Sequence, residues 1–155
     1  MTGYGVIAFE SKRGSLLAPE LLEAGVVRTR EDEGIAERLR KIYSSLSDVV
    51  KEFKPDVLAI EKLYAHTEHP ATSILMGHAR GAVCLLAGMH EIELVNIAST
   101  HVKKAVTGQG HAGKMQIQRM VQRTLGLKDL PEPPDVADAL AVAIACASQR
   151  RGGRE

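Results

Sequence analysis

Aromatic residues are scarce in this chain of 155 residues, which has no Trp, two Phe and three Tyr. A hydrophobic content of 45% is nevertheless ordinary for a globular protein, so the core must be built from aliphatic side chains. Long apolar runs are missing too, and no segment approaches the roughly 20 residues that a membrane-spanning helix needs. The composition therefore predicts one domain without a transmembrane helix.

Cysteine is nearly absent. Cys84 and Cys146 are the only two in the chain, and both lie among small apolar residues in helical patterns. Two thiols in such surroundings are typical of buried free cysteines and give no disulfide framework. The pattern predicts a protein of the reducing cytoplasm.

Acidic residues are missing from one internal stretch, although the whole chain has a net charge of only +1. No Asp or Glu lies between Glu93 and Asp129. The cations of this stretch are Lys103, Lys104, Lys114, Arg119, Arg123 and Lys128. Such a cluster indicates a phosphate-binding face, but charge alone agrees equally well with a solvated helix surface.

Hydrophobic periodicity predicts an α/β fold. The expected strands are residues 4–9, 22–29, 57–60 and 94–97, of which the last two are continuous apolar runs typical of strands buried on both faces. The expected helices are residues 35–53, 71–89, 99–106, 114–125 and 135–148. Lys54-Pro55-Asp56 ends the first of them, and Ser99 or Thr100 can cap the third. This order predicts one domain over residues 1–148, with helices packed on a mixed sheet, followed by a disordered basic tail at 149–155.

Three carboxylates occupy positions where α/β folds gather functional groups. Glu61 follows the strand at 57–60, and α/β sheets bind ligands at the carboxyl ends of their strands. Asp135 and Asp138 share one face at the start of a helix. Converging carboxylates could hold two Mg²⁺ ions roughly 4 Å apart for phosphodiester hydrolysis. The structural alternative is that the two Asp stabilise the helix start and Glu61 merely ends a strand.

Five ordered blocks of sequence resemble the RuvC family of Holliday-junction resolvases. The blocks are Thr2-Gly3-Tyr4-Gly5-Val6-Ile7, Ala59-Ile60-Glu61 with Tyr64, Gly77-His78-Ala79-Arg80-Gly81, residues 102–114, and Asp135-Val136-Ala137-Asp138-Ala139-Leu140-Ala141. Their order and spacing match over nearly the whole chain, which is far more specific than any single motif. The resemblance implies a ribonuclease H-like fold and a homodimer that makes paired, Mg²⁺-dependent nicks in four-way DNA junctions during recombination and repair.

The resemblance also implies roles for individual residues. By position, Glu61, Asp135 and Asp138 correspond to catalytic, metal-binding carboxylates, and Lys114 to a catalytic cation that stabilises the transition state. DNA contacts are implied for Tyr64, Arg80, Lys103, Lys104 and Lys114. Mn²⁺ could replace Mg²⁺ because oxygen ligands accept both ions. The RuvA and RuvB branch-migration proteins are the partners that the resemblance suggests.

Small residues suggest where the dimer forms. Gly77 and Gly81 are four residues apart in the helix predicted at 71–89, so this helix can approach a neighbour closely. In a water-soluble chain the spacing indicates either internal packing or a dimer contact. The family places its dimer contact along this helix.

The chain departs from the family before its first block. Family members begin with a strand that ends in Gly-Ile-Asp-Pro-Gly, whose Asp bridges both metal ions. That strand would lie between residues 4–9 and 57–60, and its absence explains why the sheet offers the buried strands so few parallel partners. We therefore expect the true start to lie upstream of Met1. The 155 residues carry three of the four carboxylates, so we expect them to be a poor catalyst or none.

Two other functions agree with parts of the pattern. A catalytically silent junction-binding protein is the alternative if Met1 is the true start. Another ribonuclease H-like enzyme, such as a YqgF-type nuclease, would share the fold. Residues 102–114 and the complete pair of Asp135 and Asp138 favour RuvC over that relative.

Overall fold

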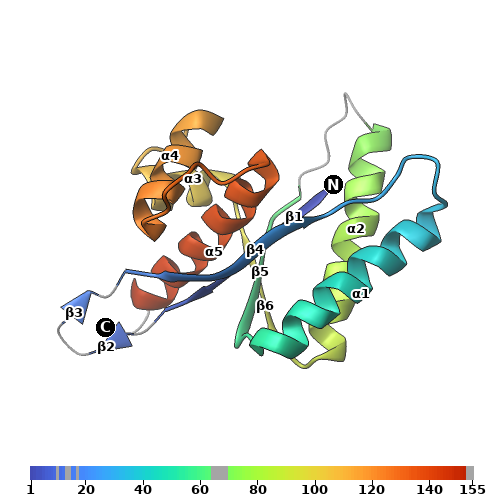
Figure 1. Ribbon diagram of the computed structural model, residues 1–155. Helices are drawn as coiled ribbons and strands as arrows, with labels where there is room; N and C mark the ends of the chain where they lie inside the picture. The colour runs from blue at the N-terminus through green and yellow to red at the C-terminus, as the bar shows by residue number, and fades with distance from the viewer. Residues whose placement is uncertain (10, 13–14, 17, 64–69, 153–155) are drawn as a thin grey trace.

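The computed structural model describes residues 1–9, 11–12, 15–16, 18–63 and 70–152 (Figure 1). Its elements are β1 (Thr2–Ala8), β2 (Ser11–Lys12), β3 (Ser15–Leu16), β4 (Glu20–Val27), α1 (Ile35–Phe53), β5 (Val57–Glu61), α2 (Pro70–Met89), β6 (Glu93–Ile97), α3 (Ser99–Thr107), α4 (Lys114–Leu125) and α5 (Pro134–Gly152). The α/β class is confirmed, and every predicted strand and helix occurs in the predicted order. The short β2–β3 pair is an addition that the sequence did not predict.

The four main strands form two ladders. β1 and β4 pair antiparallel, with Thr2 opposite Val27, and β5 and β6 pair in parallel, with Val57 opposite Glu93. Among the described strands, no ladder joins β1 to β5. Parallel and antiparallel pairing are thus both present, as expected for a mixed sheet. Among the described strands, however, they form two separate ladders instead of one sheet. Because one edge of β5 has no strand beside it, this strand is half-buried along Val57–Ile60 and not buried on both faces as predicted.

A hollow of about 1010 Å³ separates β1 from β5, and we call it the slot. Its walls are the facing edges of β1 and β5, together with apolar side chains of the neighbouring helices. These side chains include Leu46 and Val49 of α1, Leu86 of α2, and Val142 and Cys146 of α5. The slot lies between residues 4–9 and 57–60, where the sequence predicts the position of a further central strand.

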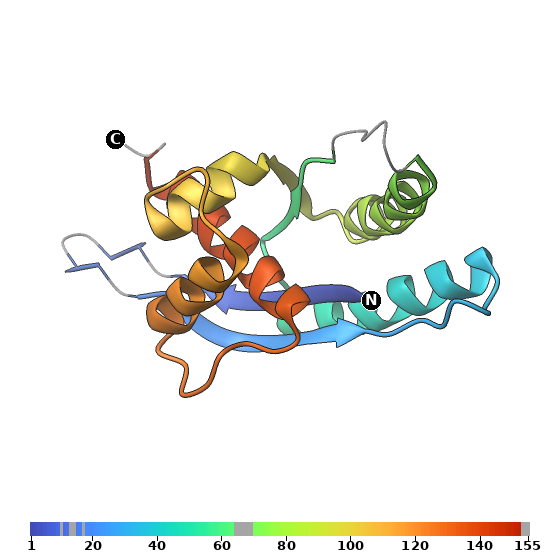
Figure 2. The same cartoon turned by 90° about the horizontal axis from the view of Figure 1, so that it is seen from above.

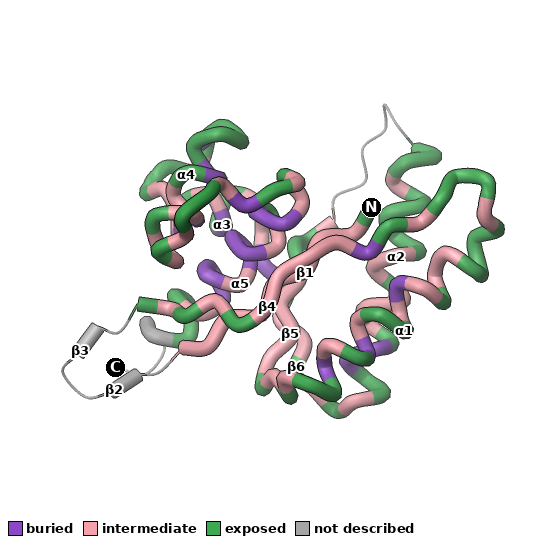
Figure 3. Tube along the Cα trace, in the orientation of Figure 1, coloured by how far each residue is buried: buried purple, intermediate pink, exposed green. Residues whose placement is uncertain are grey.

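Helices flank the two ladders. Figures 1 and 2 show α3, α4 and α5 to one side of the strands and α1 and α2 to the other. The main core forms where α5 packs against α3, α4 and the strands, and Figure 3 shows buried segments (purple) on these helices. Fully buried side chains of this core include Ile97, Val121 and Leu140. This core is aliphatic, as the composition predicts. Cys146 is buried within it, whereas Cys84 is only half-buried, and both are free thiols.

Two glycines allow β1 to lie directly against α5. A Cβ atom on Gly3 would lie 2.1 Å from the carbonyl oxygen of Asp135, and one on Gly5 would lie 2.4 Å from Cδ2 of Leu140. Any larger residue would therefore push the helix away from the strand. The two glycines fix the first turns of α5 against the start of β1.

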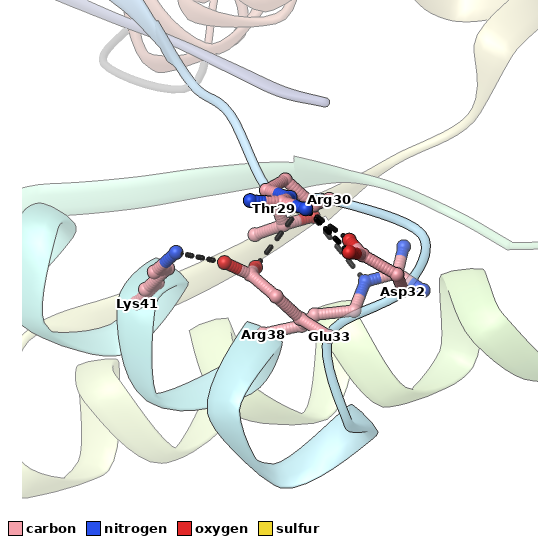
Figure 4. A network of polar contacts seen from close by, with 6 residues as sticks. All are labelled: Thr29, Arg30, Asp32, Glu33, Arg38 and Lys41. Carbon is pink, nitrogen blue, oxygen red and sulfur yellow. Dashed lines mark hydrogen bonds and ion pairs between the residues drawn. The ribbon is translucent and has the colours of Figure 1, made fainter.

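A group of polar contacts joins the end of β4 to α1 (Figure 4). The Glu33 carboxylate accepts hydrogen bonds from Lys41 Nζ and, at 3.1 Å, from the backbone N–H of Arg30. The Lys41 bond is the largest cause of the lowered pKa of Glu33, followed by the Arg30 bond. Arg38 Nε donates to Thr29 Oγ1 at 3.3 Å. Because α1 begins after Gly34 without a side-chain cap, these bonds hold its first turns.

Two predicted helix ends differ from the structure. α5 continues to Gly152, so residues 149–152 are helical and do not belong to a disordered tail; residues 153–155 lie outside the described part. Arg is a good helix former, and Arg150 Nη1 lies 2.9 Å from Glu93 Oε2. α3 begins after Ala98 with no side-chain cap, whereas the sequence predicted a Ser99 or Thr100 cap. Among the described helices, none is long and apolar enough to cross a membrane.

Candidate functional site

Glu61 is the last residue of β5, and its side chain points toward the α5 side of the strands. Val57 and Ala59 pack against the core that contains α5, and side chains of the same parity share one face of a strand. The backbone N–H of Lys62 donates to the carbonyl oxygen of Ile97 at 2.8 Å. Pairing to β6 therefore continues past Glu61 and holds the end of β5.

Asp135 and Asp138 lie in the first turns of α5. Asp135 is half-buried and Asp138 is exposed. The backbone N–H of Val136 donates to the carbonyl oxygen of Pro133 at 2.9 Å, which satisfies one of the open donors at this helix start. The close contact of Gly3 with the backbone of Asp135 places this helix start directly against β1.

The charges around Asp138 show that the predicted residues come together. The pKa of Asp138 is raised, first because surrounding protein displaces part of its water, although the residue keeps an exposed surface. Lys114 lowers this pKa, Asp135 and Glu61 raise it, and Lys103 lowers it. Such effects act at short range because water and salt screen charges. Three carboxylates and two lysines from β5, α3, α4 and α5 therefore lie near one another.

The carboxylates supply the right donors for a hard cation but do not complete a metal cage. Carboxylate oxygens are the ligands that Mg²⁺ and Mn²⁺ take in proteins. Within the part of the chain that the structure describes, however, no three Asp, Glu, His or Cys side chains lie close enough together to hold one ion. The donor set agrees in chemistry with the predicted metal site, but its carboxylates are not gathered closely enough to hold one ion.

The acid-free basic stretch forms α3, α4 and the loop between them. Lys103 is half-buried, and Lys104 and Lys114 are exposed. The Thr107 hydroxyl donates to the carbonyl oxygen of Lys103 at 2.8 Å and accepts the backbone N–H of Gln109 at 3.1 Å. α4 then begins at Lys114 with no acidic residue in its first turn. A cation at a helix start without acid leaves positive potential there, which suits an anion.

The other predicted DNA contacts have different placements. Arg80 lies on α2, where Nη1 donates to the backbone carbonyl oxygen of Glu61 at 2.5 Å and Nη2 donates to Asn96 Oδ1. Tyr64 lies outside the described residues. Asn96 is a residue that sequence reasoning missed. The signal was a polar side chain inside a strand that is otherwise apolar over residues 94–97.

We expect Asp138→Asn to raise the melting temperature at neutral pH. The raised pKa means that the ionised carboxylate is less favourable in the folded chain than in the unfolded one. The protonated carboxyl group therefore stabilises the folded chain. This stabilisation is fully present below the unfolded pKa of about 3.8 and is lost as pH rises through the higher folded pKa, so the ionised Asp138 of the parent chain lacks it at neutral pH. Solvent screening of this exposed group reduces the effect, so the expected gain is about 1–3 °C at pH 7.

Calorimetry at pH 7 and at about pH 3 tests this expectation, because the gain should vanish where the carboxylate is protonated in both states. Asp56→Asn, just before the other end of β5, is the matched control. An equal shift at both pH values would contradict an electrostatic origin.

Comparison with known proteins agrees with this geometry. The family model described as crossover junction endodeoxyribonuclease RuvC matches residues 1–146. The RuvC protein of Rhodopirellula baltica is 44% identical over 143 residues, which cover 92% of this chain and 78% of that protein. The RuvC protein of Desulforamulus reducens is 42% identical, over 99% of this chain and 92% of that protein.

Solved structures give the same result. The structure of Thermus thermophilus RuvC matches with a TM-score of 0.85 and 33% identity, covering 99% of this chain and 92% of that one. The structure of T. thermophilus RuvC in complex with a Holliday junction substrate matches with a TM-score of 0.85 and 34% identity, covering 97% and 88%. Family model, relatives and fold all agree with the resemblance found in the sequence. The chain therefore belongs to the RuvC family of crossover junction endodeoxyribonucleases.

Proposed function

We propose that this chain is the nuclease domain of a Holliday-junction resolvase, a structure-selective endonuclease that hydrolyses phosphodiester bonds in four-way DNA junctions during recombination and repair. The observation that carries the proposal is the gathering of Glu61, Asp135 and Asp138 beside Lys103 and Lys114 in a RuvC-family chain. A silent junction-binding protein and a YqgF-type nuclease are not favoured, because the family model and the relatives described above are RuvC. Cytoplasmic location and the RuvA and RuvB partners belong to the same proposal.

Each group has a task in this reaction. Glu61, Asp135 and Asp138 would hold divalent cations, Mg²⁺ or Mn²⁺, through their oxygen atoms. When bound, such ions supply an activated water and stabilise the leaving oxygen. Lys114, next to Asp138, would stabilise negative charge that develops on the phosphate. Lys103 would attract the DNA backbone to the same place.

A further strand in the slot is the second part of the proposal. β1 pairs only with β4 and β5 only with β6 among the described strands, so each has an open edge facing the slot. A strand parallel to β5 would end beside Glu61, where an acidic residue would add the missing metal ligand. We assign this place to the family's first strand, which ends in Gly-Ile-Asp-Pro-Gly.

A homodimer through α2 is the third part. Ile74, Gly77, Gly81, Leu85 and Gly88 follow one another at steps of three and four residues, so they form one stripe along the helix. All five are exposed, and Ile74 and Leu85 keep 60% and 58% of their surface accessible. An apolar stripe with small residues fits a second copy of the same helix. A two-fold dimer would place two sites on a junction of the same symmetry.

Salt dependence of junction binding tests the DNA-binding face. We expect neutralising Lys103 and Lys104 together to flatten the log–log salt slope by about 1.8, because each phosphate contact contributes about 0.9. Fluorescence anisotropy with a labelled four-way junction, without divalent metal, measures this slope. Lys51→Gln with Lys54→Gln, at the C-terminal end of α1, is the matched control and should leave the slope unchanged. An unchanged slope in the Lys103/Lys104 variant would remove α3 from the contact surface.

A further inference from the structure

We infer that Arg80 is a positioning residue that fixes the carboxyl end of β5 and so determines where the Glu61 carboxylate lies. The inference rests on the proposed metal-binding role of Glu61. Arg80 is half-buried in the middle of α2, a helix that packs against α1 and β6. Its guanidinium reaches the end of β5 from there.

One guanidinium joins the ends of two neighbouring strands. Nη1 donates to the backbone carbonyl oxygen of Glu61 on β5 at 2.5 Å, and Nη2 donates to Asn96 Oδ1 on β6. In the parallel register, Asn96 lies opposite Ile60 and Ile97 lies opposite Glu61. The planar guanidinium holds two donors in fixed directions, whereas a lysine has a single nitrogen and could not reach both acceptors in this way.

Strand alternation places this contact behind the carboxylate. The side chain of Glu61 points toward α5, with those of Val57 and Ala59, while the side chain of Asn96 points the other way, toward α2. Arg80 therefore binds the backbone of Glu61 from the face opposite Asp138. It leaves the Glu61 carboxylate available for a cation while holding the peptide that carries it.

This support is needed because, among the described strands, β5 pairs with a neighbour along one edge only. Its other edge faces the slot, and beyond Glu61 the ladder to β6 is extended by the bond from Lys62 to Ile97. A metal site requires its ligands to be held closely in place, and groups that orient ligands affect metal affinity by tenfold or more. The contact with Arg80 supplies that orientation from outside the strand pair.

A direct DNA contact is the competing role for Arg80. Lys103 and Lys114 act on Asp138 from α3 and α4, on the α5 side of the strands. Arg80 comes from α2 on the other side, and both terminal nitrogens already bind acceptors within the chain. Contact with a phosphate at the carboxylates would require it to leave Glu61 and Asn96.

The test measures two affinities of the 155-residue chain separately. Mn²⁺ affinity is measured by calorimetry, and affinity for a four-way junction is measured by anisotropy in EDTA. Arg80→Ala should weaken Mn²⁺ binding about tenfold, leave metal-free junction binding unchanged and leave the circular dichroism spectrum intact. Low-millimolar guanidinium should restore Mn²⁺ binding to Arg80→Ala, and methylammonium should not. Arg40→Ala, an exposed arginine of α1, is the matched control.

The outcomes separate this inference from the proposed function. Glu61→Gln should weaken Mn²⁺ binding in the parent chain. If it does while Arg80→Ala has no effect on Mn²⁺, the positioning role is wrong and the metal site stands. Weaker junction binding in EDTA, with Mn²⁺ affinity unchanged, would make Arg80 a DNA contact. If Glu61→Gln leaves Mn²⁺ binding unchanged, the metal-binding role fails and the positioning role fails with it.

Discussion

A strand added before Met1 and ending in Gly-Ile-Asp-Pro-Gly is expected to raise nicking of a four-way junction in Mg²⁺ by at least about 100-fold over the 155-residue chain. The added strand would fill the slot between β1 and β5 and bring a fourth carboxylate beside Glu61. A gel assay with end-labelled junctions measures the nicking rate. Symmetric cuts in opposite strands are the expected product.

Two controls separate the added carboxylate from the added strand. The same extension with Asn in place of its Asp should fill the slot and still fail to cut. Glu61→Gln in the extended protein should abolish nicking while junction binding persists, because the substitution removes a metal-binding charge and little volume. Efficient symmetric nicking by the 155 residues alone would show that a fourth carboxylate is dispensable.

Gly81→Leu is expected to shift the protein from dimer to monomer and to abolish paired nicking in the extended protein. Among the described residues, and apart from the helix's own backbone, nothing lies within 4 Å of a Cβ at this position, so the fold should accept the leucine. Between two copies of α2, however, overpacking costs about 1–3 kcal/mol, which corresponds to a dimer weaker by about 5-fold to 150-fold. Sedimentation velocity measures the change.

The matched control for the dimer is Gly34→Leu. Gly34 is equally open but lies just before α1, so this variant should remain dimeric. A parent protein that is monomeric at micromolar concentration would disprove the dimer through α2. So would a Gly81→Leu variant that associates as strongly as the parent.

The sequence predicted those features that local pattern determines. Apolar residues that recur at three- and four-residue steps predicted where α1 lies, and Lys54-Pro55-Asp56 predicted its observed end at Phe53. The convergence of Glu61 with Asp135 and Asp138 followed from a strand end and a helix start, which meet at one edge of an α/β fold. The family resemblance then turned an ambiguous set of carboxylates into a specific expectation.

Contacts between distant residues could not be predicted in the same way. The bond between Arg80 and Asn96 joins residues 16 positions apart through the packing of α2 on β6, which no local pattern encodes. The tight contact of Gly3 with Asp135 depends on the crossing of β1 and α5. Likewise, α3 begins without the predicted side-chain cap although Ser99 and Thr100 are available, because capping preference is weaker than tertiary packing.

The slot also has a consequence for how the molecule folds. Backbone hydrogen bonds couple β1 to β4 and β5 to β6, while among the described elements the two pairs are linked through helices: α5 packs against both, and α1 and α2 connect β4 to β6. Each pair can therefore open with its own free energy, and amide exchange should reveal two cooperative units in place of one. Two unpaired edges facing one hollow are also templates for pairing between molecules. A strand inserted there would close both edges and make unfolding a single transition, so the element that completes the carboxylates would also protect the protein from aggregation.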